Sequence, residues 1–355
     1  MYMNTNLALT LPTTAAAEDA AEAALARLYA GEDLDGGAAQ SLFEALVEGR
    51  LSEPSIAAML ISLRLKGETA EELTGAARAL RAADEAFPRP DYLFADTCGT
   101  GGDGSGSINV STAVAFVAAA AGLPVAKHGN RSVTSRCGSA DVLEELGAKL
   151  DVSAEVSRRA LDEAGVCFLF APRYHPGLRH AGPVRRALKV RTIMNILGPC
   201  VNPAEPQVQL LGIADPKLLE PVAKTLAALG LQKALVVHGS GLDEIALHGP
   251  TQAVRLSAGE IEPLIITPED AGLRQAPLKA LKGGGSEENA ERLKALLMGH
   301  GAAVETDVVA LNAGALLMTA GLAENLKVAV AVAKGVLASG AAYQRLKAFV
   351  DVTNA

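Results

Sequence analysis

The spacing of apolar and polar positions divides the chain near residue 90. The pattern over residues 17–86 predicts a series of helices. This part also contains residues that typically end or begin helices. Gly36-Gly37 is expected to end a helix, Ser52 to be an N-cap, and Thr69–Glu72 has the spacing of a capping box. The N-terminal part is therefore expected to be a small helical unit.

After Pro88 and Pro90, apolar residues gather in short runs separated by helical stretches. The runs lie at residues 92–97, 125–128, 166–170, 207–213 and 234–238, and the helical stretches between them include 111–121, 153–164 and 216–229. Apolar strands that alternate with helices are typical of a parallel sheet with helices over its faces. From residue 286 onward the pattern is helical again.

We therefore predict an α/β protein: a small N-terminal helical domain plus a larger domain with a mostly parallel central sheet flanked by helices. The expected boundaries are a disordered N-terminal extension at 1–15, the helical domain at 16–90, and the α/β domain at 91–181 and 201–355. A basic helical segment interrupts the alternation, so residues 182–200 are expected to pack back onto the helical domain.

Composition supports a large core and an intracellular setting. The 355 residues are 49% hydrophobic but only 3% aromatic, so Ala, Leu and Val must form the core. The four cysteines form no C-x-x-C pair, which favours buried free thiols, and no histidine spacing suits a transition metal. The first residues lack a basic segment, and the longest apolar run is broken by Gly122 and Pro124, so we expect a cytoplasmic protein without a membrane span.

The net charge of −8 hides an uneven distribution. Residues 104–140 and 164–204 contain no Asp or Glu but three and six Lys or Arg, which leaves −17 for the remainder of the chain. Such an acidic remainder disfavours a general nucleic-acid or membrane surface. The two acid-free segments are therefore the places to look for anionic ligands.

Residues 99–106 hold five glycines directly after a predicted strand. They match the dinucleotide pattern G-x-G-x-x-G, but that site needs an acidic residue about 20 positions further on, and the next acid after Asp103 is Asp141. No Gly-Lys-Ser/Thr follows, which excludes a P-loop. Glycine N–H groups that lead into a helix near Ser111 suit phosphate binding, and an unliganded tight turn is the alternative.

Further polar groups follow the next strands. Residues 127–135 combine a lysine, an arginine and three hydroxyl groups, which suits a diphosphate. Residues 173–186 offer an arginine for a carboxylate, and the adjacent acids Asp243 and Glu244 suit Mg²⁺ if they follow a turn. Each segment has an alternative interpretation without a ligand: residues 127–135 as a solvated loop, residues 173–186 as an exposed helix face, and residues 243–244 as an isolated acidic dipeptide. Taken together, the segments favour a phosphorylated sugar donor with Mg²⁺.

The joint occurrence of these motifs resembles the anthranilate phosphoribosyltransferase family, in register from about residue 40 to the C-terminus. The matching segments are Gly99–Asp103, Asn109–Thr112, Lys127–Arg131, Gly138–Asp141, Asn195–Pro199, Leu242–Glu244, Glu288–Ala290 and Leu311–Ala313. The resemblance implies a homodimer formed through the helical domain, a site between the two domains, and up to two Mg²⁺ ions in each monomer.

The resemblance also implies residue roles. Phosphoribosyl diphosphate is expected at Gly99, Gly102, Asp103, Ser107, Asn109, Val110, Ser111, Thr112, Lys127, His128, Gly129, Asn130, Arg131, Ser132, Val133, Thr134, Ser135 and Ser139. Anthranilate is expected at Gly99, His128, Asn130, His175, Arg185 and Pro199, and Mg²⁺ at Ser111, Asp243 and Glu244. Lys127, Asn130, Arg131 and Arg185 are the expected catalytic residues.

Two other functions are compatible with the fold that the resemblance implies. A pyrimidine nucleoside phosphorylase uses a Lys-His-Ser-Thr-Gly-Gly loop, whereas here Lys127-His128 continues into Gly129-Asn130-Arg131. A non-catalytic relative that binds nucleic acid is expected to have a degraded glycine loop and a basic surface. Neither pattern is that of this chain.

Overall fold

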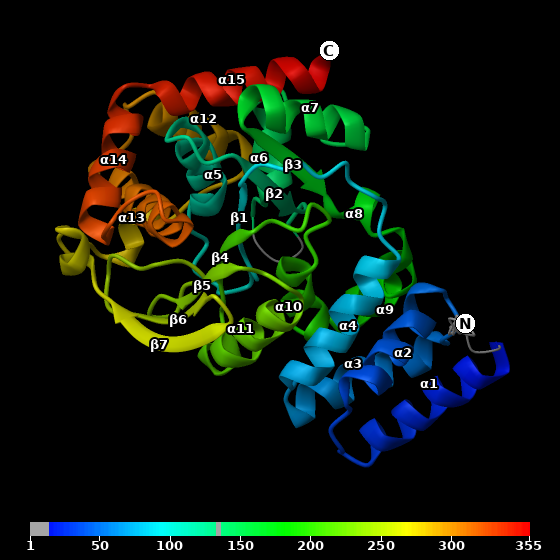
Figure 1. Cartoon of the computed structure of the whole chain (residues 1–355). Helices are drawn as coiled ribbons and strands as arrows, with labels where there is room; N and C mark the ends of the chain where they lie inside the picture. The colour runs from blue at the N-terminus through cyan, green and yellow to red at the C-terminus, as the bar shows by residue number, and fades with distance from the viewer. Residues whose placement is uncertain (1–13, 133–135) are drawn as a thin grey trace, which may run out of the picture.

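The computed structural model describes residues 14–132 and 136–355, and the chain starts with a group of helices. These are α1 (Thr14–Tyr29), α2 (Gly36–Val47), α3 (Glu53–Lys66) and α4 (Ala70–Ala82), drawn in blue and cyan in Figure 1. Helix α1 begins at Thr14, inside the extension expected at 1–15, and residues 1–13 lie outside the described part.

The predicted capping box of α4 is confirmed. The Thr69 hydroxyl accepts a hydrogen bond from the Glu72 amide at 3.2 Å, and the Glu72 carboxylate accepts one from the Thr69 amide at 2.9 Å. Glu72 is fully buried, and it also accepts a bond from the Leu34 amide and pairs with Lys66, each at 2.9 Å. A buried carboxylate is tolerated because all these donors face it, and it ties the start of α4 to α3 and to the loop before α2.

The centre of the larger domain is a sheet with seven strands among the described residues, in the order β3-β2-β1-β4-β5-β6-β7. The strands are β1 (Ala95–Gly99), β2 (Val125–Gly129), β3 (Val166–Phe170), β4 (Val208–Gly212), β5 (Lys233–His238), β6 (Thr251–Ser257) and β7 (Glu260–Ile266). The first five in this order pair in parallel, and β6 and β7 are antiparallel. The predicted fold class is confirmed.

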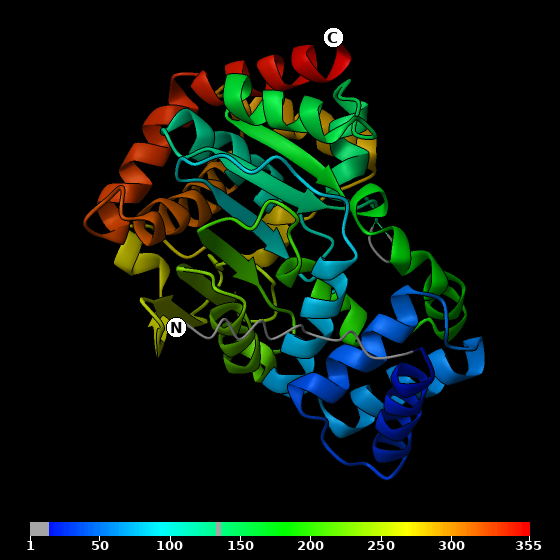
Figure 2. The same ribbon diagram turned by 45° about the vertical axis from the view of Figure 1, so that its right-hand side comes forward.

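Helices cover both faces of this sheet (Figures 1 and 2). The helices that follow α4 are α5 (Val110–Ala120), α6 (Ser139–Glu145), α7 (Ala154–Ala164), α8 (Ala171–Tyr174), α9 (Gly182–Leu188), α10 (Ile193–Cys200), α11 (Leu219–Ala228), α12 (Ser286–Leu297), α13 (Ala303–Ala320), α14 (Leu326–Ala338) and α15 (Ala341–Asn354), with 3-10 turns at Pro176–His180, Pro216–Leu218, Pro268–Ala271 and Leu278–Leu281.

Alternate residues of one strand enter two separate cores. On β5, Leu235 and Val237 belong to the core formed with α5, α7 and the C-terminal helices, while Ala234 and Val236 belong to the core formed with α11 and the N-terminal helices. Because side chains alternate across a strand, burial on both faces explains why the parallel strands show no regular alternation of apolar and polar residues.

Residues 182–200 lie against the N-terminal helices rather than over the sheet alone. Val184 of α9 and Ile193 of α10 share the second core with Leu60 of α3 and Leu80 of α4. The sequence suggested one helical segment here, but the chain forms two helices, separated where Lys189 adopts a φ of 52°. The cleft between the two domains is bounded by these two helices.

The hairpin of β6 and β7 was not predicted from the sequence. A tight turn at Ala258-Gly259, with φ values of 52° and 84°, joins the two strands. Both residues have positive φ, as two-residue hairpins require. The sequence signal that could have revealed β6 is its mixture of polar and apolar residues, because Gln252, Arg255 and Ser257 are exposed and the residues between them are buried.

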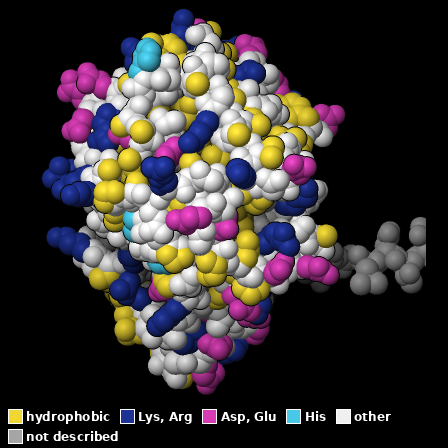
Figure 3. Space-filling model, turned by 90° about the vertical axis from the view of Figure 1, so that its left-hand side faces the viewer, with side chains coloured by type: hydrophobic (Ala, Val, Ile, Leu, Met, Phe, Trp, Pro, Cys, Tyr) yellow, Lys and Arg dark blue, Asp and Glu magenta, His cyan; other side chains and the backbone are white. Residues whose placement is uncertain are grey.

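Helix α13 is, among the described residues, the one helix whose length and hydropathy suit a membrane span, and 67% of it is buried inside the fold. It packs between the sheet and α14, so its apolar character belongs to the core. On the face shown in Figure 3, acidic and basic side chains are interspersed, and this face has no broad basic surface.

Helices α2 and α4 pack so closely that Gly75 has no room for a side chain. A Cβ at this position would overlap the Gly36 carbonyl oxygen and lie 2.8 Å from the Gln40 nitrogen. We predict that Gly75→Ala destabilises the protein by about 1–3 kcal/mol, the usual cost of overpacking. Gly335→Ala, on α14 with open space around it, is the control and should stabilise by about 0.5–1 kcal/mol. Urea unfolding measures both, and equal effects would contradict the packing argument.

Candidate active site

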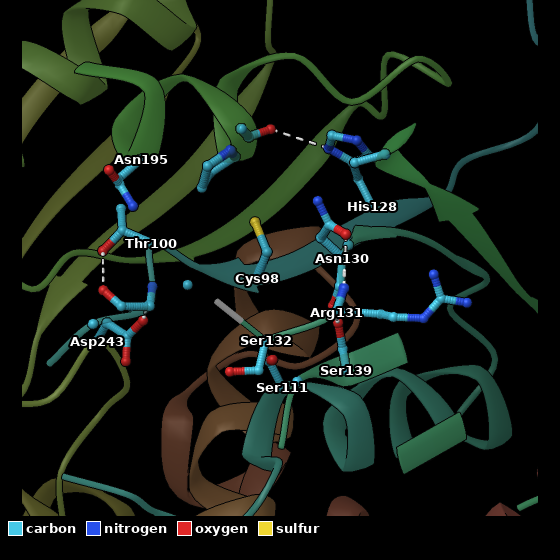
Figure 4. Close-up of a pocket in the computed structure, with 18 of the residues that line it drawn as sticks. Cys98, Thr100, Ser111, His128, Asn130, Arg131, Ser132, Ser139, Asn195 and Asp243 are labelled. Carbon is cyan, nitrogen blue, oxygen red and sulfur yellow. Dashed lines mark hydrogen bonds between the residues drawn. The ribbon is translucent and has the colours of Figure 1, made fainter. Parts of the chain in front are cut away.

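A cavity of about 340 Å³ lies where the carboxyl ends of β1 and β2 meet α9 and α10 (Figure 4). The glycine segment after β1, the loop after β2 and the acidic pair at 243–244 form its sheet side, and residues from α4, α9 and α10 form the opposite side. Ligand sites of open parallel sheets lie at this edge, beyond the carboxyl ends of the strands.

The glycine segment turns sharply before α5. Gly101 and Gly102 have φ values of 68° and 70°, which residues with a Cβ rarely adopt. The segment ends at Val110, the first residue of α5, one position ahead of the predicted start. The N–H groups at the start of α5 carry a partial positive charge, so the cavity has an anion-binding end.

Lys127 lies at the floor of this end. Its ammonium donates to the Thr97 carbonyl at 2.6 Å and to the Ser111 hydroxyl at 3.1 Å, and only 3% of the residue is exposed. A buried ammonium with two neutral acceptors keeps one donor for a further acceptor. Lys127 therefore provides a fixed positive charge beside the start of α5.

Arg131 has a different environment from the one expected. Its guanidinium pairs with Glu144, and it also lies over the Phe170 ring, 4.7 Å from the centroid. Figure 4 shows this side chain extended away from Asp243 and Ser111. Ser132 and Gly138 donate their backbone amides to Asp141 at 2.9 and 2.7 Å, which holds the two ends of the loop together.

Asp243 and Glu244 converge on the glycine segment and on α5, as expected for acids on a turn. Asp243 accepts a hydrogen bond from the Gly101 amide at 2.6 Å, and Glu244 accepts one from the Ser111 amide at 3.2 Å. Burial and the neighbouring Asp103 raise the pKa of Asp243 to about 7. Burial and Asp243 raise the pKa of Glu244 to about 8.

This acidic pair fits a divalent cation. The carboxylates are desolvated and repel each other, so a cation that binds both removes an unfavourable interaction. The oxygen donors present suit Mg²⁺, which takes few protein ligands and completes its shell with water and substrate phosphate. The described residues contain no cluster of three or more His, Cys, Asp or Glu arranged as a protein-only metal site.

Arg185 of α9 faces the opposite end of the cavity. Its guanidinium is half-buried and has no hydrogen-bond or ion-pair partner among residues 14–132 and 136–355, and burial lowers its pKa. Leu80, Leu178 and Pro199 provide apolar surface nearby. An unpaired guanidinium beside apolar walls suits a ligand that has both a carboxylate and a ring.

Two histidines link this end to the helical domain. His128 and His175 contact each other through their Nε2 atoms at 3.0 Å, and the Nδ1 atom of His175 contacts Asp84, which follows α4. On the other side of the cavity, Arg191 donates to the Gly102 carbonyl at 2.9 Å and to the Thr100 hydroxyl at 3.3 Å. Sequence reasoning missed Asp84 and Arg191; Arg191 lay in an acid-free segment, while nothing in the sequence marked Asp84.

The structure brings the expected site residues into one cavity wherever it describes them. Those that line it are Gly99, Gly102, Asp103, Ser107, Asn109, Val110, Ser111, Thr112, Lys127, His128, Gly129, Asn130, Arg131, Ser132, Ser139, His175, Arg185, Pro199, Asp243 and Glu244. Val133, Thr134 and Ser135 lie outside the described residues. The individual roles remain predictions.

The two domains and this site define a class of glycosyl transferases. Residues 22–83 match the glycosyl transferase family, helical bundle domain, and residues 91–343 match the glycosyl transferase family, a/b domain. A curated relative from Sorangium cellulosum, an anthranilate phosphoribosyltransferase, is 60% identical over 92% of this chain and 94% of its own length. A Yersinia pestis relative with the same name is 53% identical over 91% and 97%. The chain belongs to the anthranilate phosphoribosyltransferase family.

Solved structures agree with this assignment. The anthranilate phosphoribosyltransferase from Thermus thermophilus superimposes with a TM-score of 0.89 at 44% identity, covering 94% of this chain and 99% of that one. The enzyme from Saccharomyces cerevisiae, solved in complex with PRPP and Mg, gives a TM-score of 0.86 at 25% identity, covering 96% and 99%.

The raised pKa values predict how stability depends on pH without a metal. A buried carboxyl with a raised pKa binds its proton more tightly in the folded state, so its contribution to stability is fully present below the unfolded pKa of about 4. That contribution is lost as the pH rises through the folded values of about 7 and 8. In EDTA, the wild type should therefore lose stability between about pH 4 and pH 8, and Asp243→Asn should reduce this loss by on the order of 1 kcal/mol.

Urea unfolding across this pH range measures the effect. Asp91→Asn, at an exposed aspartate away from the cavity, serves as the control and should follow the wild type. Parallel curves for the wild type and Asp243→Asn would contradict the assignment.

Proposed function

We propose that this protein transfers the 5-phosphoribosyl group of 5-phospho-α-D-ribose 1-diphosphate to the amine of anthranilate. The products are N-(5-phosphoribosyl)anthranilate and diphosphate, and the reaction is the second step of tryptophan biosynthesis from chorismate. The observation that carries the proposal is one cavity with an anion-binding end, at Lys127 and the start of α5, and an unpaired Arg185 at its other end.

The donor is assigned to the sheet side of the cavity. The glycine segment, the start of α5 and Lys127 line the end of the cavity where we place the phosphates. Breaking the bond between the ribose C1 and the diphosphate builds negative charge on the leaving group, which these fixed donors stabilise. Arg131 would reach the donor only after its guanidinium leaves Glu144, so we assign it to the donor-bound state.

Ser111, Asp243 and Glu244 would hold Mg²⁺, in up to two ions for each monomer. A bound Mg²⁺ supplies charge neutralisation to the diphosphate. The geometry that supports this is the convergence of both carboxylates and the Ser111 hydroxyl on Lys127 and the glycine segment. The lysine beside the acids keeps part of their charge balanced in the metal-free protein.

The acceptor is assigned to the side of α9 and α10. Arg185 would bind the carboxylate of anthranilate, while Pro199, His128 and His175 would line its ring and Asn130 its amine. The amine of anthranilate is neutral at pH 7, so it needs orientation more than deprotonation, and we assign no general base. Catalysis on the acceptor side is therefore a matter of position.

We also propose a cytoplasmic homodimer formed through the helical domain. Leu65 of α3 is 80% exposed and Tyr29 at the end of α1 is 55% exposed, so the helical domain offers large apolar side chains for such an interface. Contacts in a dimer would remove both from water.

One assay tests the reaction itself. Incubating the purified protein with anthranilate, phosphoribosyl diphosphate and Mg²⁺ should consume the fluorescence of anthranilate, at a rate that depends on both the donor and the metal. Omitting each component in turn is the control. Persistent fluorescence across a wide range of Mg²⁺ concentrations would contradict the proposed function.

Arg185→Ala should separate the two substrates. Losing a charged, partly desolvated hydrogen-bond donor costs about 1.5–3 kcal/mol, so we expect the KM for anthranilate to rise by roughly 10- to 100-fold. The KM for phosphoribosyl diphosphate should change little. The matched control is Arg186→Ala, since Arg186 is exposed on the same helix and does not line the cavity. Equal increases in both KM values would rule out the assigned role of Arg185.

A further inference from the structure

Three side chains form a continuous hydrogen-bonded chain between the helical domain and the cavity. Asp84 follows the end of α4, His175 precedes the 3-10 turn at 176–180, and His128 lies in β2. The Asp84 carboxyl contacts the Nδ1 atom of His175, and the Nε2 atom of His175 lies 3.0 Å from the Nε2 atom of His128. The Nδ1 atom of His128 lies 3.0 Å from the carbonyl oxygen of Gly198, and Figure 4 shows this bond from the His128 ring as a dashed line.

The Gly198 carbonyl determines which ring nitrogens of His128 and His175 carry hydrogen. A carbonyl oxygen only accepts, so the Nδ1 atom of His128 carries a hydrogen, and the Nε2 atom of an uncharged His128 must accept. The Nε2 atom of His175 must then be the donor to His128. One proton remains to be placed, and it lies between the Nδ1 atom of His175 and Asp84.

Burial favours placing this proton on Asp84. The Asp84 side chain is 8% exposed and that of His175 is 1% exposed. The second carboxyl oxygen of Asp84, Oδ2, is buried with no hydrogen-bond partner among the described residues. A carboxylate with one bare oxygen beside a charged imidazole would desolvate two ions, whereas a neutral carboxyl and a neutral imidazole avoid that cost.

The charged groups around these three side chains do not reverse the preference for a proton on Asp84. Arg81 lowers the pKa of Asp84 and Glu205 raises it, but burial is the largest effect and raises the pKa to about 8. Burial lowers the pKa of His175 to about 4. Burial, His175 and Lys127 lower the pKa of His128, against the hydrogen bond to Gly198.

We propose that Asp84 is a positioning residue, which donates its proton to the Nδ1 atom of His175 and thereby fixes His175 and His128 as uncharged rings in one orientation at the wall of the cavity. The inference rests on the proposed function, since the ring of the aromatic acceptor is assigned to this wall. The rings meet edge to face, with centroids 4.8 Å apart and an angle of 69° between their planes.

This arrangement bears on how the acceptor is oriented. If either imidazole were protonated, it would be a second cation at the acceptor's end and would compete with Arg185 for the carboxylate. Uncharged rings leave that carboxylate to Arg185, so the amine is held in one direction toward the donor. Because Asp84 follows α4, it also makes the position of the histidines depend on the helical domain.

Two substitutions separate position from charge. Asp84→Asn keeps an N–H donor toward the Nδ1 atom of His175 and has no charge in any state, so it should keep the KM for anthranilate within about twofold of the wild type. Asp84→Ala removes the donor and should raise that KM about tenfold, the effect of one lost hydrogen bond of ordinary strength. The KM for phosphoribosyl diphosphate should be unchanged in both variants. Asp151→Asn, at an exposed carboxyl that pairs with Arg173, is the matched control.

The tautomers give a readout that does not depend on turnover. Nitrogen NMR of the full-length protein labelled at histidine should show, in the wild type and in Asp84→Asn at pH 7, one neutral ring with hydrogen on Nε2 and another with hydrogen on Nδ1. In Asp84→Ala, the Nδ1 atom of His175 loses its hydrogen-bond donor, so its nitrogen signal should move toward that of a nitrogen without a hydrogen bond, while the tautomers set by the Gly198 carbonyl remain. A charged His175 in the wild type, or an Asp84→Asn variant as impaired as Asp84→Ala, would overturn the proposal.

Failures of the two proposals can be told apart. Tautomers as expected, without any consumption of anthranilate, would contradict the proposed function and leave the hydrogen-bond assignment standing. Normal turnover with a charged His175 would contradict the inference alone. If Asp84→Ala does not fold, as urea unfolding would show, the charge state in the wild type and the kinetics of Asp84→Asn still decide the question.

Discussion

The backbone at Asp243 lies so close to the ends of two neighbouring strands that only glycine fits there. Gly99 ends β1 and Gly212 ends β4, and the two are paired in register. A Cβ on Gly212 would overlap the Asp243 carbonyl, and one on Gly99 would overlap its carboxyl group. This contact places Asp243 and Glu244, both partly buried, over the sheet, beside the glycine segment and the start of α5. The raised pKa values, the fit to Mg²⁺ and the anion-binding end of the cavity all depend on it.

Much of the fold followed from patterns within single segments. Most of the parallel strands were evident because burial on both faces favours short apolar runs, and the start of α4 was evident because Thr69 and Glu72 cap it by local hydrogen bonds. The glycine segment was evident for a similar reason, since its positive φ values are a local demand on residue type. The missed hairpin of β6 and β7 is half exposed, so it lacks the apolar run that marked the other strands.

The candidate site was harder to predict wherever its geometry depends on residues far apart in sequence. Arg131 lies in the loop after β2, as expected, but its partner Glu144 comes from α6, and no pattern in the loop indicates that pairing. Asp84 and His175 are separated by 91 positions and meet only because the chain returns to the helical domain. The family resemblance supplied positions that line the cavity, but it supplied no information about the contacts behind them.

The charge distribution shows how these contacts and the proposed ligands are related. Both substrates in the proposed reaction are anions, and the two segments without Asp or Glu contribute the loops on both sides of the cavity. The carboxyl groups that do approach these loops come from elsewhere in the chain, and each is already engaged: Glu144 by Arg131, Asp141 by the Ser132 amide, and Asp243 by the Gly101 amide. Asp84 fits the same scheme if it carries a proton. Negative charge near the cavity is therefore either paired, neutralised by a proton, or concentrated at the acidic pair, where a divalent cation can reverse its sign before an anionic donor binds.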